Sequence, residues 1–224
     1  MLERLDPTAC ALLSRVAKPW LAAVVSRGLQ RAGKGGALPL KLLSFVGSAE
    51  LLAWGKDNGC PWNERTRAHV AAGGNLAALR WAREHGCEWD SNTCKFAARG
   101  GHLAVLVWAR EQDCPWGECC EFAAWGGHLD VLQWALQHGA PWDTWTCTFA
   151  ALGGHLAVLQ LARAHDCEWD GCTCAYAAKG GHMEVMQWAR EHGAPWDEDY
   201  VRERAVQGGH QDILESWLAE HGHP

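Results

Sequence analysis

Apolar and polar residues recur along this chain at helical spacing, in short segments separated by glycines. Residues 87–113 are representative, because their Ala-rich first segment, Thr93–Arg99, stops at a Gly-Gly pair. Beyond the pair, apolar residues return three and four positions apart, as on one face of an α-helix. They include Leu103, Leu106 and Val107. The pattern predicts two short helices joined by a tight turn.

The same unit is copied along the chain. The pair Gly-Gly begins at residues 73, 100, 126, 153, 180 and 208. One tryptophan column consists of Trp62, Trp89, Trp116, Trp142, Trp169 and Trp196. A second column consists of Trp81, Trp108, Trp134, Leu161 and Trp188, with Trp54 upstream and Trp217 one residue out of phase. Three columns that keep a period of about 27 residues indicate a tandem repeat.

Residues that stop helices follow the second helix of each unit. They are Gly59, Gly86, Asp113, Gly139, Asp166, Gly193 and Gly222. Gly suits the left-handed position after a helix, and Pro follows within two residues in four of the units. Each unit is therefore predicted to be a complete helix–turn–helix. Helices of this length are marginal alone in water, so the units must stack on one another.

Stacked units of this kind form a solenoid. Each tryptophan can bury roughly 150–250 Å² of surface, so the two tryptophan columns are expected to hold the units together. The sequence predicts an all-α helical solenoid of about six to seven repeats, with little or no β-structure.

One sequence string resembles a known repeat family. The string T-C-x-x-A-A-x-G-G-H-L-x-V-L-x-W-A, from Thr93 to Ala109, is similar to the ankyrin core T-P-L-H-x-A-A-x-x-G-H-x-x-V-V. It resembles most the short, Trp-rich ankyrin repeats of algal, oomycete, amoebal and giant-virus proteins, over residues 48–222. The resemblance implies an ankyrin-type scaffold that binds a protein partner through its concave face. Usual ankyrin units have about 33 residues, so the missing length is expected in the β-hairpin finger between units.

Two domains are expected, a solenoid over residues 36–222 and an N-terminal helical segment over residues 1–35. Residues 36–59 look like a degenerate first unit. In the last unit Arg202 and Arg204 replace a Cys and an aromatic residue, which suits the polar cap of a solenoid.

The N-terminal segment has two interpretations. Residues 4–27 resemble the second half of an F-box, through Leu5-Asp6-Pro7, Arg15-Val16 and Trp20. This resemblance implies docking to a Skp1-type adaptor and a role as substrate receptor of an SCF-type ubiquitin ligase. The alternative is an amphipathic cap for the solenoid.

Composition narrows the function classes. The chain has 224 residues, with 20 basic and 26 acidic side chains and a formal net charge of -6. This balance argues against a nucleic-acid partner, which usually meets a basic stripe. No apolar run of about 18 residues predicts a membrane span, and no secretory signal is visible. The 11 cysteines are then expected to be reduced thiols inside a cell, in the cytoplasm or nucleus.

The cysteines and histidines follow the repeat rather than a site of chemistry. Most cysteines share two columns, in one of which they alternate with alanine, as expected for small buried residues. A histidine column shares its position with Ser48 and Asn75, both good helix N-caps, so its side chains are expected to bond nearby backbone. Its members are His102, His128, His155, His182 and His210. We therefore expect no metal, no cofactor and no enzymatic activity.

Columns that vary between units are the candidates for partner binding. One column, after the Ala-Ala pair, reads Ala72, Arg99, Trp125, Leu152, Lys179 and Gln207. A second, at the preceding turn, reads Arg65, Asn92, Cys119, Trp145, Cys172 and Tyr200. Large apolar residues where solvent is expected suggest a binding hot spot. The predicted partner-binding residues are Trp125, Trp145 and Leu152, flanked by Arg99 and Lys179.

Two alternatives concern these aromatic side chains. Trp125 and Leu152 could be adjacent only for local packing. The column of Phe96, Phe122, Phe149 and Tyr176 is expected to be inter-repeat core.

Overall fold

The computed structural model describes residues 49, 52–53, 64–87 and 90–221, all within the unit Gly47–Pro224. Twelve full helices in these ranges form six pairs. The first helices of the pairs are α4 (Glu64–Ala72), α6 (Ser91–Arg99), α8 (Cys119–Gly126), α10 (Thr144–Gly153), α12 (Gly171–Gly180) and α14 (Glu198–Gly208). The second helices are α5 (Leu76–Glu84), α7 (Leu103–Glu111), α9 (Leu129–Gln137), α11 (Leu156–Ala164), α13 (Met183–Glu191) and α15 (Gln211–His221).

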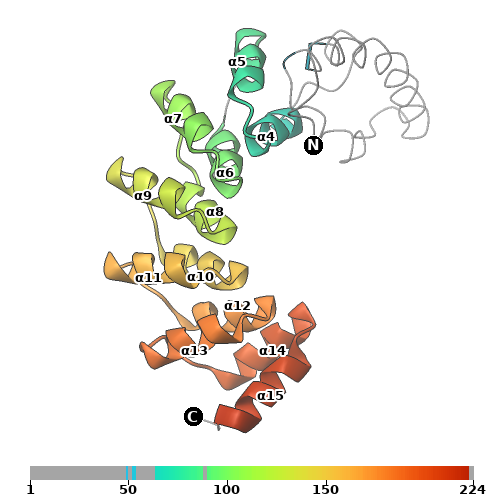
Figure 1. The fold of residues 1–224 in the computed structure, drawn as a ribbon, viewed down its shortest axis with the longest axis vertical. Coiled ribbons are helices and arrows are strands. Elements are labelled where there is room, and N and C mark those ends of the chain that lie inside the picture. The colour runs from blue at the N-terminus through green and yellow to red at the C-terminus, as the bar shows by residue number, and fades with distance from the viewer. Residues whose placement is uncertain (1–48, 50–51, 54–63, 88–89, 222–224) are drawn as a thin grey trace, which may run out of the picture. The chain divides into compact units, whose positions relative to one another are not determined.

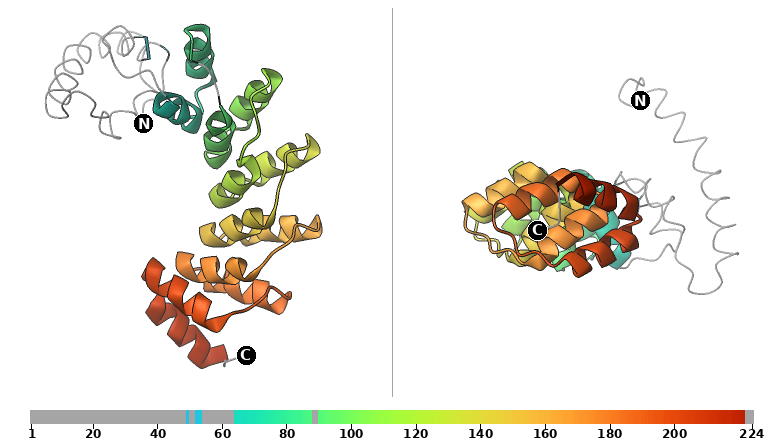
Figure 2. Two further views of the ribbon diagram at one scale, coloured as in Figure 1. Left: turned by 180° about the vertical axis from the view of Figure 1, so that it is seen from behind. Right: turned by 90° about the horizontal axis from the view of Figure 1, so that it is seen from below.

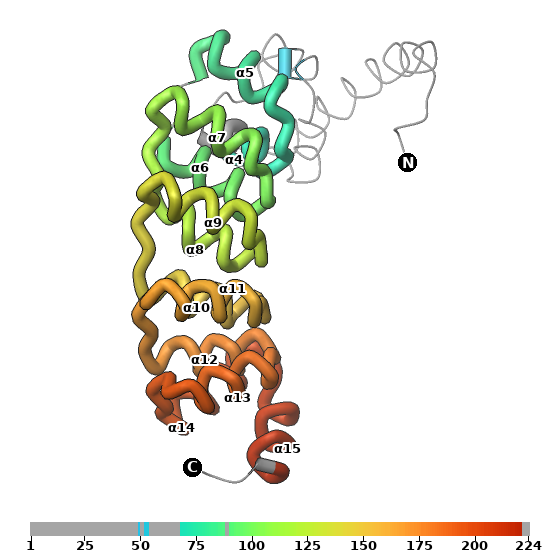
Figure 3. The backbone as a smooth tube through the Cα atoms, turned by 60° about the vertical axis from the view of Figure 1, so that its left-hand side comes forward, coloured from blue at the N-terminus to red at the C-terminus, as the bar shows by residue number. Residues whose placement is uncertain are grey.

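The pairs from α4 to α15 follow one another in a single row (Figure 1). The even-numbered helices lie close together on the inner side of this row, α5 to α13 lie farther apart on its outer side, and α15 lies below α14 at the end of the row. Figure 3, turned so that the odd-numbered helices come forward, shows that chain order and stacking order are the same. Figure 2 shows the row from behind and from below. Each pair therefore packs mainly on its two neighbours in sequence.

The prediction of an all-α helical repeat solenoid is confirmed, and the described residues contain no strand. The predicted degenerate unit at 36–59 lies almost wholly outside the described residues, as do Trp54, Trp62 and Trp89. The predicted boundary at residue 35 also lies outside them and stays a prediction.

The Gly-Gly pairs are explained by the turn that they build. The second glycine of each described pair lies in the left-handed region, as Gly101 does with φ 71°. The amide of His102 then donates to the carbonyl of Ala97 at 2.9 Å, and that of Gly101 donates to Ala98 at 3.1 Å. These two bonds close the end of α6 in the Schellman pattern. The predicted break at Gly100-Gly101 is therefore a defined helix end.

The first glycine of each pair is required for a different reason. A Cβ at Gly126 would lie 2.5 Å from the backbone oxygen of Arg99 in the preceding unit. It would also lie 2.5 Å from the ring of His128. Glycine at this position therefore lets successive units approach one another closely.

The histidine column begins the second helices as expected, but its bonds are different from those expected. Asn75 caps α5 by accepting a bond from the Ala78 amide at 2.9 Å, whereas the histidines make no such cap bond. Instead, Nε2 of His128 donates to the carbonyl of Arg99 at 2.9 Å, and that of His155 donates to the carbonyl of Trp125 at 3.0 Å. An imidazole is long enough to reach the preceding unit, where a Ser or Asn is not. The histidines thus link neighbouring repeats.

The core consists of small and aliphatic residues rather than tryptophans. The largest fully buried side chains include Leu106, Leu132, Leu159 and Met186, one in each successive second helix. The described tryptophans of both repeating columns are half-buried from α5 to α13. Ala, Leu and Val fill the core between the units, and the expectation that the tryptophans hold the units together stays a prediction.

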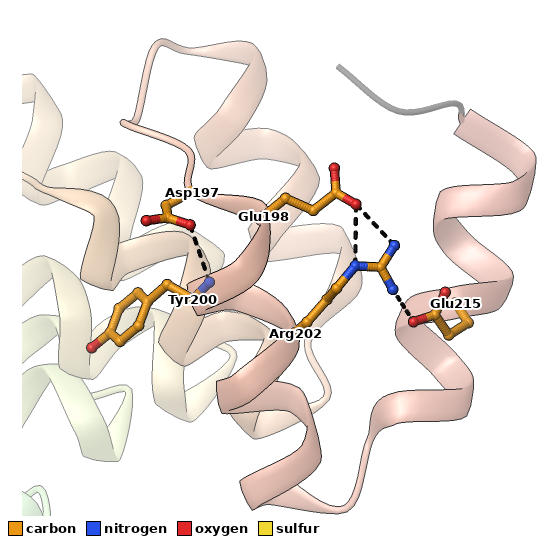
Figure 4. Close-up of polar contacts among 5 residues, drawn as sticks. All are labelled: Asp197, Glu198, Tyr200, Arg202 and Glu215. Carbon is orange, nitrogen blue, oxygen red and sulfur yellow. Dashed lines mark hydrogen bonds and ion pairs between the residues drawn. The ribbon is translucent and has the colours of Figure 1, made fainter.

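The last unit carries polar contacts that link its two helices. Arg202 on α14 donates two hydrogen bonds to Glu198, at 3.1 and 2.8 Å, and one to Glu215 on α15 (Figure 4). The same unit also exposes 56% of Val206 and 48% of Ile213. Its surface is therefore mixed rather than uniformly polar, in contrast to the predicted cap.

No helix in the described part of the chain is both long enough and apolar enough to span a bilayer.

Candidate protein-binding face

Side chains three and four positions apart on a helix lie on one face of it. On α10 these are Trp145, Phe149 and Leu152, and the neighbouring even-numbered helices present the equivalent positions. We call this surface the inner aromatic face. It consists of Phe96 and Arg99 on α6, Phe122 and Trp125 on α8, Trp145, Phe149 and Leu152 on α10, Tyr176 and Lys179 on α12, and Tyr200 and Arg204 on α14.

Aromatic rings contact one another across the repeats of this face. The ring centroid of Phe122 lies 6.3 Å from that of Phe96 and 5.7 Å from that of Phe149. Trp145 lies 6.1 Å from Phe149 and contacts Tyr176 edge-on at 6.2 Å. Such spacings are those of favourable aromatic pairs. The rings thus form a continuous ladder from α6 to α12.

The ladder is not buried core, although its rings contact each other as inter-repeat core would. The side chains of Phe96, Phe122, Phe149 and Tyr176 are all half-buried. The prediction of a core column is therefore wrong in its burial. Buried Ala and Cys side chains make the contact between the helices beneath these rings. One part of each ring therefore stays open to solvent.

Trp145 is the most exposed tryptophan of the described residues, with 43% of its surface open to solvent. It stands in the first turn of α10, two residues after the N-cap Asp143, whose carboxylate accepts a hydrogen bond from the Trp145 amide at 2.9 Å. The cap fixes the helix start and therefore the direction of the indole. A large ring held in solvent by an ordered helix end is typical of a binding anchor.

Trp125 contacts Phe122, Phe149 and Arg99. Both Phe centroids lie 5.7 Å from the indole, and the Arg99 guanidinium carbon lies 4.0 Å from the centre of the ring. These ring contacts give Trp125 a packing role beyond the simple alternative of a contact with Leu152. The side chain is still only half-buried, so one part of it remains open to a partner.

Of the five predicted residues, the structure therefore brings Arg99 and Trp125 into direct contact. Phe149 lies between Trp125 and Trp145 and joins them, with ring centroids 5.7 and 6.1 Å away. Lys179 lies farther along the row, its Nζ 5.3 Å from the centre of the Tyr176 ring. Leu152 is half-buried in the last turn of α10.

Two positively charged residues of the face were missed by the sequence reasoning. Arg204 lies between two rings, with its guanidinium carbon 4.9 Å from the Tyr200 centroid and 5.4 Å from that of Tyr176. Lys95 lies 4.3 Å from the centre of Phe122 and forms an ion pair with Glu118. The place of Arg204 in the aromatic column was a signal for the first, but nothing in the repeat pattern marked Lys95.

One carboxyl group beside the face has an altered acidity. Partial burial, together with the nearby charges of Asp143 and Glu118, raises the pKa of Glu121 from its ordinary value of 4.5 to about 7. Lys95 opposes this shift. The negative charge of Glu121 is therefore only partly present at neutral pH.

A second aromatic region lies along the second helices and the loops before the first helices. Arg110 covers the Trp116 ring at 4.3 Å, and Trp116 contacts Trp134 at 5.7 Å. Trp134 in turn stacks on His138 at 4.3 Å. Together with Val107 and Glu111, these side chains line an open pocket of about 340 Å³.

The same arrangement recurs in later units. Arg163 covers Trp169, which contacts Trp188, and Arg190 covers Trp196, which contacts Trp217. We call this region the tryptophan edge, made of the sets Arg110–Trp116–Trp134, Arg163–Trp169–Trp188 and Arg190–Trp196–Trp217.

The described cysteines are small buried residues, as the column pattern predicted, apart from the half-buried Cys172. Burial raises the pKa of the Cys120 and Cys174 thiols to about 12, so both are protonated at neutral pH. Among the residues that the structure describes, no group of three His, Cys, Asp or Glu side chains converges to hold a metal ion.

Comparison with known proteins agrees with the repeat pattern. Residues 119–163, which run from α8 to α11, match the family model for ankyrin repeats (many copies). Among solved structures, the ankyrin repeat domain of human ASB11 is similar, with 17% sequence identity and a TM-score of 0.48. That similarity covers 67% of this chain and 82% of the human one. A search of curated proteins found no match.

The family match falls on the two units that carry Trp125, Trp145 and Leu152. Ankyrin repeats generally mediate protein–protein interactions and typically have no enzymatic activity. Residues 119–163 of this all-α solenoid are therefore similar to ankyrin repeats.

Proposed function

We propose that the chain is a protein–protein interaction scaffold that binds its partner through the inner aromatic face. The observation that carries the proposal is the exposure of Trp145 in the ladder, beside a column of residues that differ from unit to unit. The indole contacts Phe149 and Tyr176, but 43% of the residue stays open to solvent. Its burial by a partner would stabilise a complex.

Two further features support this use of the face. The histidine links fix the backbone carbonyls of Arg99 and Trp125, so the face is a rigid surface before any partner arrives. A preformed surface loses little conformational freedom on binding. The ladder also spans four successive units, which is enough for an extended contact rather than a single pocket.

The test compares three variants with the natural protein in affinity capture from the source cell. Trp145→Ala removes the exposed anchor, and Trp125→Ala removes its neighbour on α8. Trp142→Ala is the matched control, because it removes an indole from the loop before α10 instead of from the face. Both face variants should lose partners that the control and the natural protein retain, with unchanged circular dichroism. Equal capture by all of them would reject the proposal.

A second function concerns the N-terminal segment and rests on sequence alone. We propose it only as a separable hypothesis, because residues 4–27 lie outside the described residues. If they dock a Skp1-type adaptor, the chain would be a substrate receptor of an SCF-type ubiquitin ligase. Size-exclusion chromatography of the full chain with a Skp1-type protein tests this directly, and separate elution of the two would reject it.

The cellular location also remains a prediction from the sequence. We propose an intracellular site of action, in the cytoplasm or nucleus, because buried thiols without disulfides suit a reducing compartment. Fluorescence microscopy of a tagged full-length chain would test it.

A further inference from the structure

The charge of the inner aromatic face is opposite to that of the whole chain. The chain has a formal net charge of -6. The column that holds the ladder ends in Arg204, and the column beside it contains Arg99 and Lys179. Neither column contains an acidic residue from α6 to α14. The face is therefore a positively charged strip on a negatively charged protein.

Its cations are held by rings rather than neutralised by carboxylates. Arg99 lies 4.0 Å from the Trp125 centroid, and its side chain is exposed. Lys179 lies 5.3 Å from the Tyr176 centroid. A guanidinium stacked on a ring still presents its in-plane N–H groups, which match a carboxylate in a bidentate fashion. Stacking thus orders these charges without occupying their hydrogen-bond donors.

The nearby acidic residues do not cancel this charge. Glu118 is already paired with Lys95. Glu203 accepts a hydrogen bond from Gln207 at 2.9 Å, along α14. Glu121 is partly protonated at neutral pH because burial disfavours its charge.

We propose that the partner presents to this face a segment with an apolar centre and acidic residues on both sides. This inference rests on the proposed function of the face and names the chemistry of its occupant. The apolar centre covers Trp145, Phe149 and Leu152, and the acidic residues meet Arg99 at one end and Lys179 at the other.

The spacing of the acidic residues follows from the stack. Arg99 and Lys179 lie three repeat steps apart, on α6 and α12. Packed helices are about 8–10 Å apart, which separates the two charges by roughly 24–30 Å. An extended chain covers that distance in about seven to nine residues.

Single-stranded nucleic acid is the other ligand that uses cations and stacked rings. It is disfavoured here because Arg99, Lys179 and Arg204 are single cations on separate helices and do not form the continuous basic stripe that a phosphate backbone follows. The rings of the ladder also pack against one another, which leaves no gaps into which bases could insert. A protein segment with a few acidic residues fits this surface better than a continuous polyanion.

The experiment selects peptides from a random display library with inserts of about 12 residues, long enough to span the face. The natural full-length chain and Trp145→Ala are used as parallel targets. We expect peptides that bind only the natural chain, with Trp, Phe or Leu near the centre and an excess of Asp and Glu over Lys and Arg. Trp145-dependent peptides without that excess would overturn the inference while the proposed function survives.

The absence of any Trp145-dependent peptide would count against the proposed function itself, so the two failures are distinguishable. A fluorescein-labelled oligouridine is tested beside the peptides as a nucleic-acid probe. If it bound the natural chain more tightly than the best peptide, the inference would be overturned in favour of a nucleic-acid ligand.

The best peptide is then measured by fluorescence anisotropy against a matched pair of variants. Arg99→Glu reverses a charge on the inner face. Arg80→Glu makes the same change on the outer helix α5, where an exposed guanidinium also lies over a tryptophan, 5.6 Å from Trp108. We expect Arg99→Glu to weaken binding at least about tenfold at low salt and Arg80→Glu to change it less than about twofold. Equal effects of the two variants would overturn the inference.

Discussion

The tryptophan edge and the inner aromatic face both combine cations with aromatic rings, but the edge repeats the same residues and the face varies them. Both place cations on aromatic rings, as Arg110 covers Trp116 at the edge and Arg99 covers Trp125 on the face. At the edge the same set of one Arg and two Trp recurs three times. On the face, the column after the Ala-Ala pair changes in each unit, and reads Arg99, Trp125, Leu152 and Lys179. Constancy indicates a scaffold that each unit needs, and variation indicates a surface free to recognise a partner.

Burial explains why the two regions can differ in this way. Each edge set joins consecutive repeats, because Arg110 belongs to one unit and Trp134 to the next. On the face, the buried Cys and Ala beneath the ladder already close the contact between helices. Substitutions on the face therefore cost less stability than substitutions at the edge, and this difference can be measured.

The largest effect is expected at the edge. Replacing Trp116 and Trp134 together by Ala removes two half-buried indoles from one inter-repeat contact. The free energy of unfolding in urea should fall by about 3–5 kcal/mol, comparable to the loss of one fully buried aromatic side chain. The control is Trp142→Ala, whose ring contacts His165 instead of a second tryptophan, at 5.9 Å. It should cost less, and a double variant as stable as the natural chain would remove the edge from its scaffold role.

The next effect tests the close approach of the repeats beneath both regions. Gly126→Ala should lower the free energy of unfolding by roughly 1–3 kcal/mol, because its Cβ meets backbone that cannot move aside. Gly139→Ala is the matched control, since Gly139 has φ 78° but no atom within 4 Å of a Cβ. It should cost about 1 kcal/mol from backbone strain alone. Equal losses would mean that the close contact is not needed.

A smaller effect is the pH dependence of stability that Glu121 causes beside the inner aromatic face. The pKa of Glu121 is raised to about 7 by burial and neighbouring acids, so the folded chain holds a proton that the unfolded chain has released. The stability that this proton contributes is complete below about pH 4.5 and is lost as the pH rises through about 7. Glu121→Gln should thus have a higher free energy of unfolding than the natural chain at pH 8 and the same value at pH 4.5. The difference should stay below about 1 kcal/mol, because the group is partly exposed.

The smallest effect concerns a histidine that links repeats. Burial, and then the charge of His155, lower the pKa of His182, with a smaller contribution from His210, while the Leu152 carbonyl acts in the opposite direction. The unfolded chain therefore binds a proton first, and stability is lost as the pH falls below about 6.5. His182→Asn, which introduces the residue type of the N-cap Asn75, should reduce the fall in melting temperature between pH 7 and pH 5. If the melting temperature depended on pH as in the natural chain, protonation of His182 would not be what destabilises the fold.

The repeat architecture was predictable because each of its signals is local. Gly-Gly pairs, apolar residues at helical spacing and a Gly or Asp after each second helix determine helix ends within a few residues. Asp113 and Asp166 do adopt the left-handed position, with φ 62° and 57°. The order of the stack then follows from chain order, because a unit this small has no other surface to pack on.

The partners of long side chains were not predictable from local signals. The bond of His128 to the carbonyl of Arg99 joins residues 29 positions apart, so a reading of neighbouring backbone could not find it. The half-burial of the tryptophans was missed for a similar reason, since aliphatic residues from two units close the core first. On the face, the variable columns include Arg99, Trp125 and Trp145, and Arg204 stands in the aromatic column, whereas Lys95 enters only through the geometry of the stack.

The comparison depends most on the energetic role of the exposed indole on the face. The free energy of unfolding of Trp145→Ala, measured by urea denaturation of the full chain, tests it directly. The account predicts a loss of only about 1–2 kcal/mol, from the contacts of the indole with Phe149 and Tyr176. A loss as large as that of the Trp116 and Trp134 double variant would contradict it, because the ladder would then hold the stack together.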